Sequence, residues 1–188
     1  MSELTLQDLL AMTGKERFEL MTTGHPLDLD QLDGTQYLGV DLSLPRFMNA
    51  ILWKTFRKTF VRDPGSGTVR GWNVRLEQHG VDADPVPMTD KAGQQLTFGH
   101  YHVRSAEGLR FPRGWSGGHY LDYGVAGNTF LDPGRVGYTP LVAVNAGSMD
   151  LLLGWEVVRI GPVLVPIPDY WALCRPEPLQ EIVAPPRA

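Results

Sequence analysis

Three histidines within residues 96–123 are the side chains best suited to chemistry in this chain. Side chains of an extended strand alternate between two faces, so His100 and His102 are expected to share a face with Phe98. His119 belongs to the next strand-like segment. A neutral imidazole can bind a carbonyl group or transfer a proton near neutral pH. Two interpretations stay open: the histidines line a cavity, or they are hydrogen-bonded polar residues on a solvent-facing strand or at a barrel rim. On the first interpretation all three are catalytic candidates.

A single carboxylate lies within the apolar segment 151–160, LLLGWEVVRI. Burial without a partner would raise the pKa of Glu156 and suit it to act as a general acid or base. Pairing with Arg159 or another base would instead give it a structural role. Glu156 is therefore the fourth catalytic candidate.

Aromatic and basic residues are candidates for binding a ligand. Large aromatics dominate burial in small barrels, and an aromatic on a glycine-rich loop, such as Trp115, either covers a pocket or packs against the end of the barrel. The run between Asp41 and Asp63 contains five cations and no acid. One interpretation of this run is a basic barrel mouth that attracts an anionic ligand group or a membrane surface. The other is a solvent-exposed hairpin at the edge of the sheet. The ligand-binding candidates are Phe98, Tyr123, Trp115, Trp155, Arg57 and Lys58.

The same histidines also suit a metal ion, because two imidazoles on one strand face can present a pair of nitrogen ligands. The segment FGHYHVRSAEGLRFPRG resembles the first motif of the cupins, metal-binding barrels, since Glu107 follows the histidine pair and Gly114 follows Glu107 at the cupin spacing. The resemblance implies a divalent transition metal held by His100, His102, Glu107 and His119. The second cupin motif, with its further histidine, is missing from LDPGRVGYTP. We therefore expect no cofactor, and the metal is the alternative.

Helices are predicted in only two places. Thr5 and Thr13 are each followed three positions later by an acid, which is the spacing of a capping box, so residues 5–23 should form two short helices. Residues 25–34 are predicted to be a linker. Apolar residues at helical spacing predict one more short helix over 45–52.

The remaining sequence has the period-two pattern and the turn signals of a β-protein. The 21 glycines and 15 prolines fit many turns. The segment 161–168 is bounded by prolines and is predicted to be a connection or an edge strand. Strands are expected at about 36–43, 54–62, 68–77, 96–103, 119–123, 141–145, 151–160 and 169–175.

The predicted fold class is mainly β, a single antiparallel barrel of about eight strands, which is enough to hold one small ligand. A length of 188 residues fits one such domain. We expect a helical appendage and linker over 1–34, the barrel domain over 35–175 and a proline-rich tail over 176–188.

Composition restricts the classes of partner and the compartment. A net charge of −4 argues against a general nucleic-acid binder. The single cysteine, Cys174, fits a reducing compartment. We recognise no secretory signal and no apolar run long enough to insert stably in a membrane, so the expected location is cytoplasmic. Oligomeric state stays open.

The strand count, with a helix after the first strand, resembles the calycins, which include lipocalins and intracellular fatty-acid-binding proteins. The resemblance covers roughly residues 35–175 and concerns architecture, because the lipocalin Gly-x-Trp signature and the Arg-x-Tyr pair of the fatty-acid binders are both absent. It implies binding of a small, largely apolar molecule in the barrel lumen. The alternative is a barrel enzyme, either an isomerase, cyclase or lyase with His and Glu as acid-base groups or a cupin-like metal-dependent enzyme.

Overall fold

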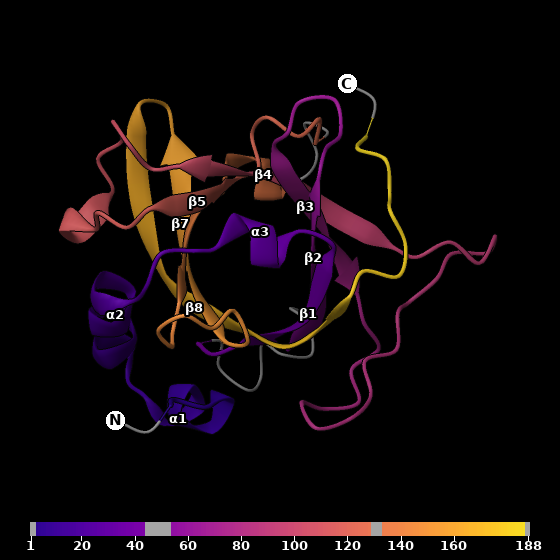
Figure 1. The fold of residues 1–188 in the computed structure, drawn as a ribbon, viewed down its shortest axis with the longest axis horizontal. Helices are drawn as coiled ribbons and strands as arrows, with labels where there is room; N and C mark the ends of the chain where they lie inside the picture. Colours follow the sequence, from indigo (N-terminus) through magenta and orange to yellow (C-terminus); the bar gives the residue numbers. More distant parts are fainter. Residues whose placement is uncertain (1–2, 44–53, 129–132, 187–188) are drawn as a thin grey trace.

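Eight antiparallel strands close into a barrel in the computed structural model, which describes residues 3–43, 54–128 and 133–186 (Figure 1). Each strand pairs with the next along the chain, and the last pairs with the first. The predicted mainly-β, single-barrel fold is confirmed. The strands are β1 Thr35–Asp41, β2 Thr55–Arg62, β3 Val69–Arg75, β4 Thr97–Ser105, β5 His119–Asp122, β6 Tyr138–Ala143, β7 Leu152–Ile160 and β8 Val163–Pro178.

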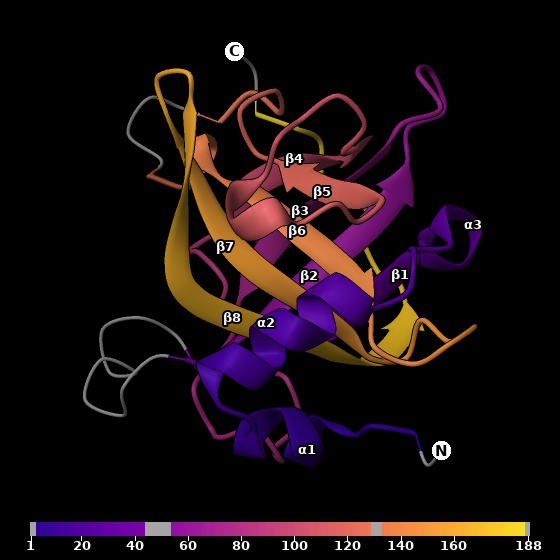
Figure 2. The same cartoon turned by 90° about the vertical axis from the view of Figure 1, so that its left-hand side faces the viewer.

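The two predicted N-terminal helices are present as α1 (Leu6–Ala11) and α2 (Gly14–Thr23). Each begins with the predicted capping box, in which a threonine hydroxyl and an acid three residues later satisfy free amide groups. Figure 2 shows α2 lying across the outside of β7 and β8. Its buried Met21 packs in one cluster with Trp155 of β7. The outer surface of this part of the barrel is therefore apolar.

A third helix, α3 (Leu29–Leu32), lies within the segment predicted to be a linker. The Asp28 carboxylate accepts hydrogen bonds from two backbone amides of its first turn, which explains why so short a helix forms. Leu27 and Leu32 are buried with residues of the lumen. Figures 1 and 2 together place α3 over one end of the barrel, so this end of the lumen is closed.

The third predicted helix, over 45–52, lies outside the described residues. No helix in the described part of the chain is long and apolar enough to cross a membrane.

The C-terminal part of the chain consists of a long strand and a segment without regular structure that packs on the outside of the barrel. Residues 163–168 of the proline-bounded segment form the first part of β8, which pairs with β7, so of the two alternatives the strand is the one found. Beyond β8, Leu179 and Val183 pack on the outer face of β3 at Trp72, and Figure 1 shows this segment running along β2 and β3. The Arg70 Nη1 donates to the Val183 carbonyl oxygen at 3.0 Å. The tail covers a second apolar patch on the outside of the barrel.

Strand β4 contains a bulge that changes which side chains face inward. Gly71 pairs with Tyr101 and Asn73 pairs with Phe98, so β4 has one residue more than β3 over this interval. Gly99 takes a φ of 52°, a left-handed conformation that favours glycine. The alternation of side chains along β4 is therefore interrupted at Gly99.

Candidate functional site

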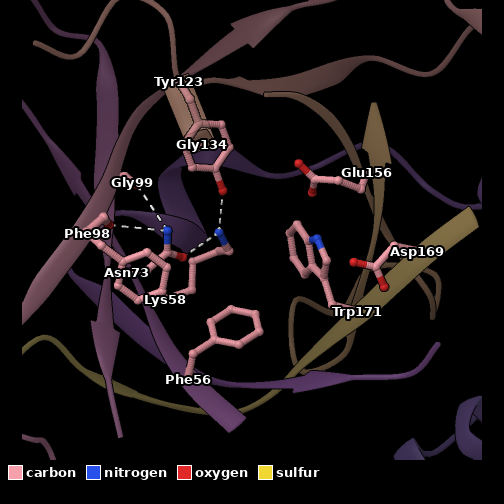
Figure 3. Close-up of a pocket in the computed structure, with 10 residues that line it drawn as sticks. All are labelled: Phe56, Lys58, Asn73, Phe98, Gly99, Tyr123, Gly134, Glu156, Asp169 and Trp171. Atoms are coloured by element: carbon pink, nitrogen blue, oxygen red, sulfur yellow. Dashed lines mark hydrogen bonds between the residues drawn. The ribbon is translucent and has the colours of Figure 1, made fainter. Parts of the chain in front are cut away.

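The lumen contains a cavity of about 260 Å³ in the half of the barrel away from α3. Four aromatic side chains and four polar side chains converge on it from strands all round the barrel (Figure 3). The loop after β5 contributes Tyr123, and Gly134 also lies at the wall. The lining residues are Phe56, Lys58, Asn73, Phe98, Gly99, Tyr123, Gly134, Glu156, Asp169 and Trp171.

Lys58 is placed in this cavity by the alternation of β2, whose inward residues are Phe56, Lys58 and Phe60. Its ammonium nitrogen Nζ donates to Asn73 Oδ1 at 2.7 Å and to the Tyr123 hydroxyl oxygen at 2.8 Å. The same nitrogen lies 4.6 Å from the ring centres of both Tyr101 and Trp171. Aromatic faces stabilise a cation, so these rings help the two acceptors to hold the lysine head group.

The β4 bulge fixes the orientation of Asn73. The Asn73 Nδ2 donates to the backbone carbonyl oxygens of Phe98 at 3.4 Å and of Gly99 at 3.0 Å. With its amide nitrogen used in this way, the side chain presents its oxygen to Lys58. A Cβ atom at Gly99 would lie 2.8 Å from Asn73 Nδ2. The glycine is therefore needed both for the backbone conformation and for the close approach of Asn73.

Burial makes the Lys58 amine unusually easy to deprotonate. The side chain is fully enclosed, and loss of hydration disfavours the charged form. This desolvation lowers the pKa of Lys58 to about 7, against the opposing attraction of the Glu156 carboxylate. A substantial fraction of Lys58 is consequently the neutral amine near pH 7.

Glu156 of β7 faces Lys58 across the cavity (Figure 3). Burial raises the pKa of Glu156, while the charge of Lys58 and hydrogen bonds from Trp171 and Thr139 partly oppose the shift. The Thr139 hydroxyl donates to Glu156 Oε2 at 3.3 Å. The sequence prediction of a desolvated carboxylate with a raised pKa agrees with this geometry.

A second acid lies on the same wall as Glu156. Burial and the nearby carboxylates of Asp41 and Glu156 raise the pKa of Asp169 to about 7. Its Oδ1 atom is buried and has no hydrogen-bond partner among the described residues. The cavity therefore combines one amine with two carboxyl groups whose pKa values are raised by burial.

Glycines on the inner faces of two strands make room for the aromatic walls. A Cβ at Gly154 of β7 would lie 2.3 Å from the Trp171 ring, and a Cβ at Gly39 of β1 would lie 2.3 Å from the Phe56 ring. Both rings therefore lie close against the neighbouring backbone. The shape of the cavity depends on these two positions having no side chain.

The structure separates the three histidines that the sequence suggested would line one cavity. His100 lies outside the barrel, where its ring centre is 6.1 Å from that of Trp72. His102 is on the same outer face, where burial lowers its pKa and Arg104 and Asp122 are its charged neighbours. Phe98 does line the lumen, because the bulge at Gly99 lies between Phe98 and the histidines.

His119 and Glu107 lie apart from both the cavity and the histidine pair. His119 begins β5, pairs with Ser105 at the end of β4, and has a pKa lowered by burial. Glu107 is exposed in the turn after β4. Within the described ranges, no group of three or more His, Cys, Asp or Glu side chains is arranged to hold a metal ion.

Among the ligand-binding candidates, Phe98, Tyr123 and Lys58 line the cavity, whereas the other three lie outside the barrel wall. Trp155 packs beneath α2, with its ring centre 5.1 Å from that of Phe18. Arg57, adjacent to Lys58, faces outward, and its Nη2 donates to the Pro85 carbonyl oxygen at 3.3 Å. Trp115 is buried against Phe111 under the N-terminal helices.

Trp115 anchors α2, so its replacement should affect stability and leave the lumen unchanged. Its indole Nε1 donates to the Met21 carbonyl oxygen at 3.0 Å, satisfying a group in the last turn of the helix. Trp115→Phe should lower the free energy of unfolding by about 1–2 kcal/mol, measured by urea denaturation. Binding of a small aromatic probe in the lumen should stay the same. A loss of binding without a loss of stability would contradict this assignment.

Sequence reasoning missed Phe56, Asn73, Asp169 and Trp171 as cavity residues. The signals were weak but present: Asn73 is a polar residue on the same strand face as Val69 and Gly71, and Gly99 interrupts a strand pattern, which often marks a bulge. Asp169 and Trp171 stand two residues apart and so share a face. Comparison of the chain with protein-family models, with curated proteins and with solved structures finds no match.

Proposed function

We propose that this barrel binds a small, largely apolar molecule with one polar group in the half of its lumen away from α3. The observation that carries the proposal is the cavity itself, in which aromatic rings form most of the wall and Lys58 and Glu156 face each other. Binding sites for small molecules usually combine apolar walls with a few placed polar groups. The closed eight-stranded barrel is also compatible with a calycin-like architecture.

The size of the cavity limits the ligand. A volume of about 260 Å³ is below the roughly 300–1,000 Å³ of sites for drug-sized ligands. The half of the lumen nearer α3 is filled by buried side chains such as Tyr37, Phe60 and Leu152. The expected ligand therefore has one ring or a short chain, and a long fatty acid does not fit.

The charges of the wall favour a neutral polar group. One amine faces two carboxyl groups, and a ligand carboxylate would bring a further negative charge into a desolvated space that already disfavours ionisation of those two groups. A carbonyl or hydroxyl oxygen could accept a hydrogen bond from Lys58 without this cost. A small aromatic alcohol, aldehyde or ketone fits these requirements.

Benzyl alcohol is a suitable probe, and we expect one molecule to bind per chain with a dissociation constant of roughly millimolar or tighter. Lys58→Met removes the hydrogen-bond donor and should weaken binding by about tenfold. Arg57→Gln changes the neighbouring, outward-facing residue and should leave the affinity unchanged. Isothermal titration calorimetry measures all three proteins.

Failure of benzyl alcohol and similar probes to bind the folded wild-type protein would refute the proposal. Equal weakening by both variants would show that the binding site is not in the lumen. Native mass spectrometry of the freshly purified protein would then identify the class of any molecule that is carried through purification.

A further inference from the structure

One amine, that of Lys58, is the candidate nucleophile of this cavity. Lys58 is the only basic side chain among the described residues that line the cavity, and its relative exposure is 1%. The chain has three other lysines, Lys15, Lys54 and Lys91, and none of them lines the cavity. Chemistry directed at an amine in the lumen can therefore be assigned to a single residue.

The hydrogen bonds of Lys58 leave a neutral amine able to react. Both partners, Asn73 Oδ1 and the Tyr123 hydroxyl oxygen, accept from Nζ. A neutral amine has two N–H bonds and one lone pair, so these two contacts use the N–H bonds and leave the lone pair for a ligand. The nitrogen also lies 4.6 Å from the ring centres of Tyr101 and Trp171. The nucleophilic nitrogen is thus fixed at the wall of the cavity.

Among the residues that the structure describes, two tyrosines and two acids are the titratable groups that face Lys58. Tyr101 of β4 and Tyr123 after β5 are weak acids, and burial raises the pKa of Tyr101 well above its ordinary value. Glu156 of β7 attracts the charged form, and Asp169 of β8 lies beyond it. Desolvation outweighs the attraction of Glu156, so the pKa of Lys58 falls to about 7. Neutral amine is therefore available at physiological pH.

Glu156 is placed to exchange a proton with a ligand that Lys58 attacks. Its carboxyl group faces Lys58 across the cavity and is held by Thr139, whereas Nζ is held by Asn73 and Tyr123 (Figure 3). Because the two groups have separate anchors, a ligand oxygen can lie between them. Burial keeps Glu156 protonated to a higher pH than an ordinary carboxylate.

We propose that Lys58 forms a reversible imine with the carbonyl group of a small aldehyde or ketone bound in the lumen, with Glu156 as the proton donor to the carbonyl oxygen. The Nζ lone pair forms a bond to the carbonyl carbon, and the oxygen takes a proton to give a carbinolamine. Nitrogen then loses one proton, which passes through the Glu156 carboxylate to the hydroxyl oxygen, so the C–O bond breaks and water leaves. The second N–H proton of the resulting iminium returns to Glu156 and leaves the neutral imine. The sum is amine plus carbonyl giving imine plus water, with no change of oxidation state. The inference rests on the proposed lumen site and narrows its ligand to carbonyl compounds.

Reductive trapping tests the inference directly. The folded protein is incubated with benzaldehyde and sodium cyanoborohydride, which reduces an imine to a stable secondary amine, and the modified residue is identified by peptide mass mapping. We expect one benzyl group per chain on Lys58 at neutral pH. At pH 7 a lysine with a pKa of about 7 contains roughly a thousandfold more neutral amine than an exposed lysine with a pKa near 10.4. Labelling of Lys15 and Lys91 should lag accordingly.

Three variants separate the roles of the residues. Lys58→Met should abolish the lumen adduct, and Lys91→Met, at an exposed position, should leave it unchanged. Glu156→Gln keeps the shape of the acid and should slow trapping about a hundredfold at neutral pH. Any free α-amino group, which titrates near pH 8, is read separately in the peptide map. The wild-type map decides the question even if a variant fails to fold.

The outcomes distinguish this inference from the proposed function. Adduct on Lys58 that is suppressed by excess benzyl alcohol supports both. Binding of benzyl alcohol with no adduct on Lys58, or with equal labelling of Lys15 and Lys91, would overturn the imine and leave the binding function standing. Neither binding nor trapping would overturn both.

Discussion

Replacing Gly71 with alanine should destabilise the barrel by about 3 kcal/mol or more, enough to unfold many small domains. Gly71 faces inward on β3, where a Cβ would lie 1.9 Å from the Thr59 carbonyl oxygen and 2.5 Å from the Tyr101 hydroxyl oxygen. The Tyr101 hydroxyl donates to that same carbonyl. The methyl group would have to displace backbone, which cannot yield as a flexible side chain would.

Gly14→Ala is the matched control for this prediction. Gly14 opens α2, and a Cβ there would have no neighbour within 4 Å. Alanine also has the better helix propensity, so the control should be neutral or stabilising by up to about 1 kcal/mol. Urea denaturation of the three proteins gives the comparison. Stabilities for the two variants within about 0.5 kcal/mol of each other would contradict the close packing at Gly71.

The free energy of unfolding should rise with pH between about pH 7 and pH 9.5, and Lys58→Met should remove most of that rise. In this range an unfolded lysine, with a pKa near 10.4, still holds a proton. Folded Lys58, with a pKa of about 7, has released it. The unfolded state therefore binds more protons, and stability increases with pH by up to about 1.4 kcal/mol per unit.

Urea denaturation at about pH 7, 8 and 9 measures this slope. Lys91→Met, which removes an exposed lysine, should keep the wild-type slope. Burial raises the pKa of Tyr37 to about 12, and such tyrosines reverse the trend at higher pH, which sets the upper limit of the range. Equal slopes for wild type and Lys58→Met would show that the Lys58 amine stays protonated in the folded state.

Ionisation of Asp169 should have the opposite effect on the free energy of unfolding, at lower pH. Its pKa is raised to about 7, so between pH 4 and pH 7 the folded state holds a proton that the unfolded state has lost. Its contribution to stability therefore falls as pH rises through this range. Urea denaturation across this range gives the free energy of unfolding of wild type and of Asp169→Asn. The difference between their pH dependences isolates this contribution.

The helices and strands were predicted well where they depend on interactions between residues close in the sequence. The hydroxyl and acid pairs beginning at Thr5 and Thr13 form the capping boxes of α1 and α2 as expected. The turn signal between β2 and β3 does join two paired strands. Helix α3 was missed because four residues carry no helical period, and its formation depends on Asp28 and on burial of Leu32.

The candidate site was only partly predictable, since it depends on which face of each strand is inside. Strict alternation groups His100 with Phe98, and the single extra residue at Gly99 sends them to opposite sides of the wall. Strand β7 is apolar on both faces, so its pattern cannot decide between Trp155 and Glu156. The choice is made by α2, which covers Trp155 and leaves Glu156 for the lumen.

Closure of the sheet by β8 on β1 also shapes how the chain must fold. This pairing joins residues such as Leu38 and Cys174, which are far apart in the sequence, so its loop-closure entropy is large. Proteins rich in such long-range contacts fold slowly, and until the last strand arrives both β1 and β7 expose unpaired backbone groups. During synthesis on the ribosome, β8 is made last. The nascent barrel is therefore most prone to aggregation just before its sixteen-residue final strand emerges.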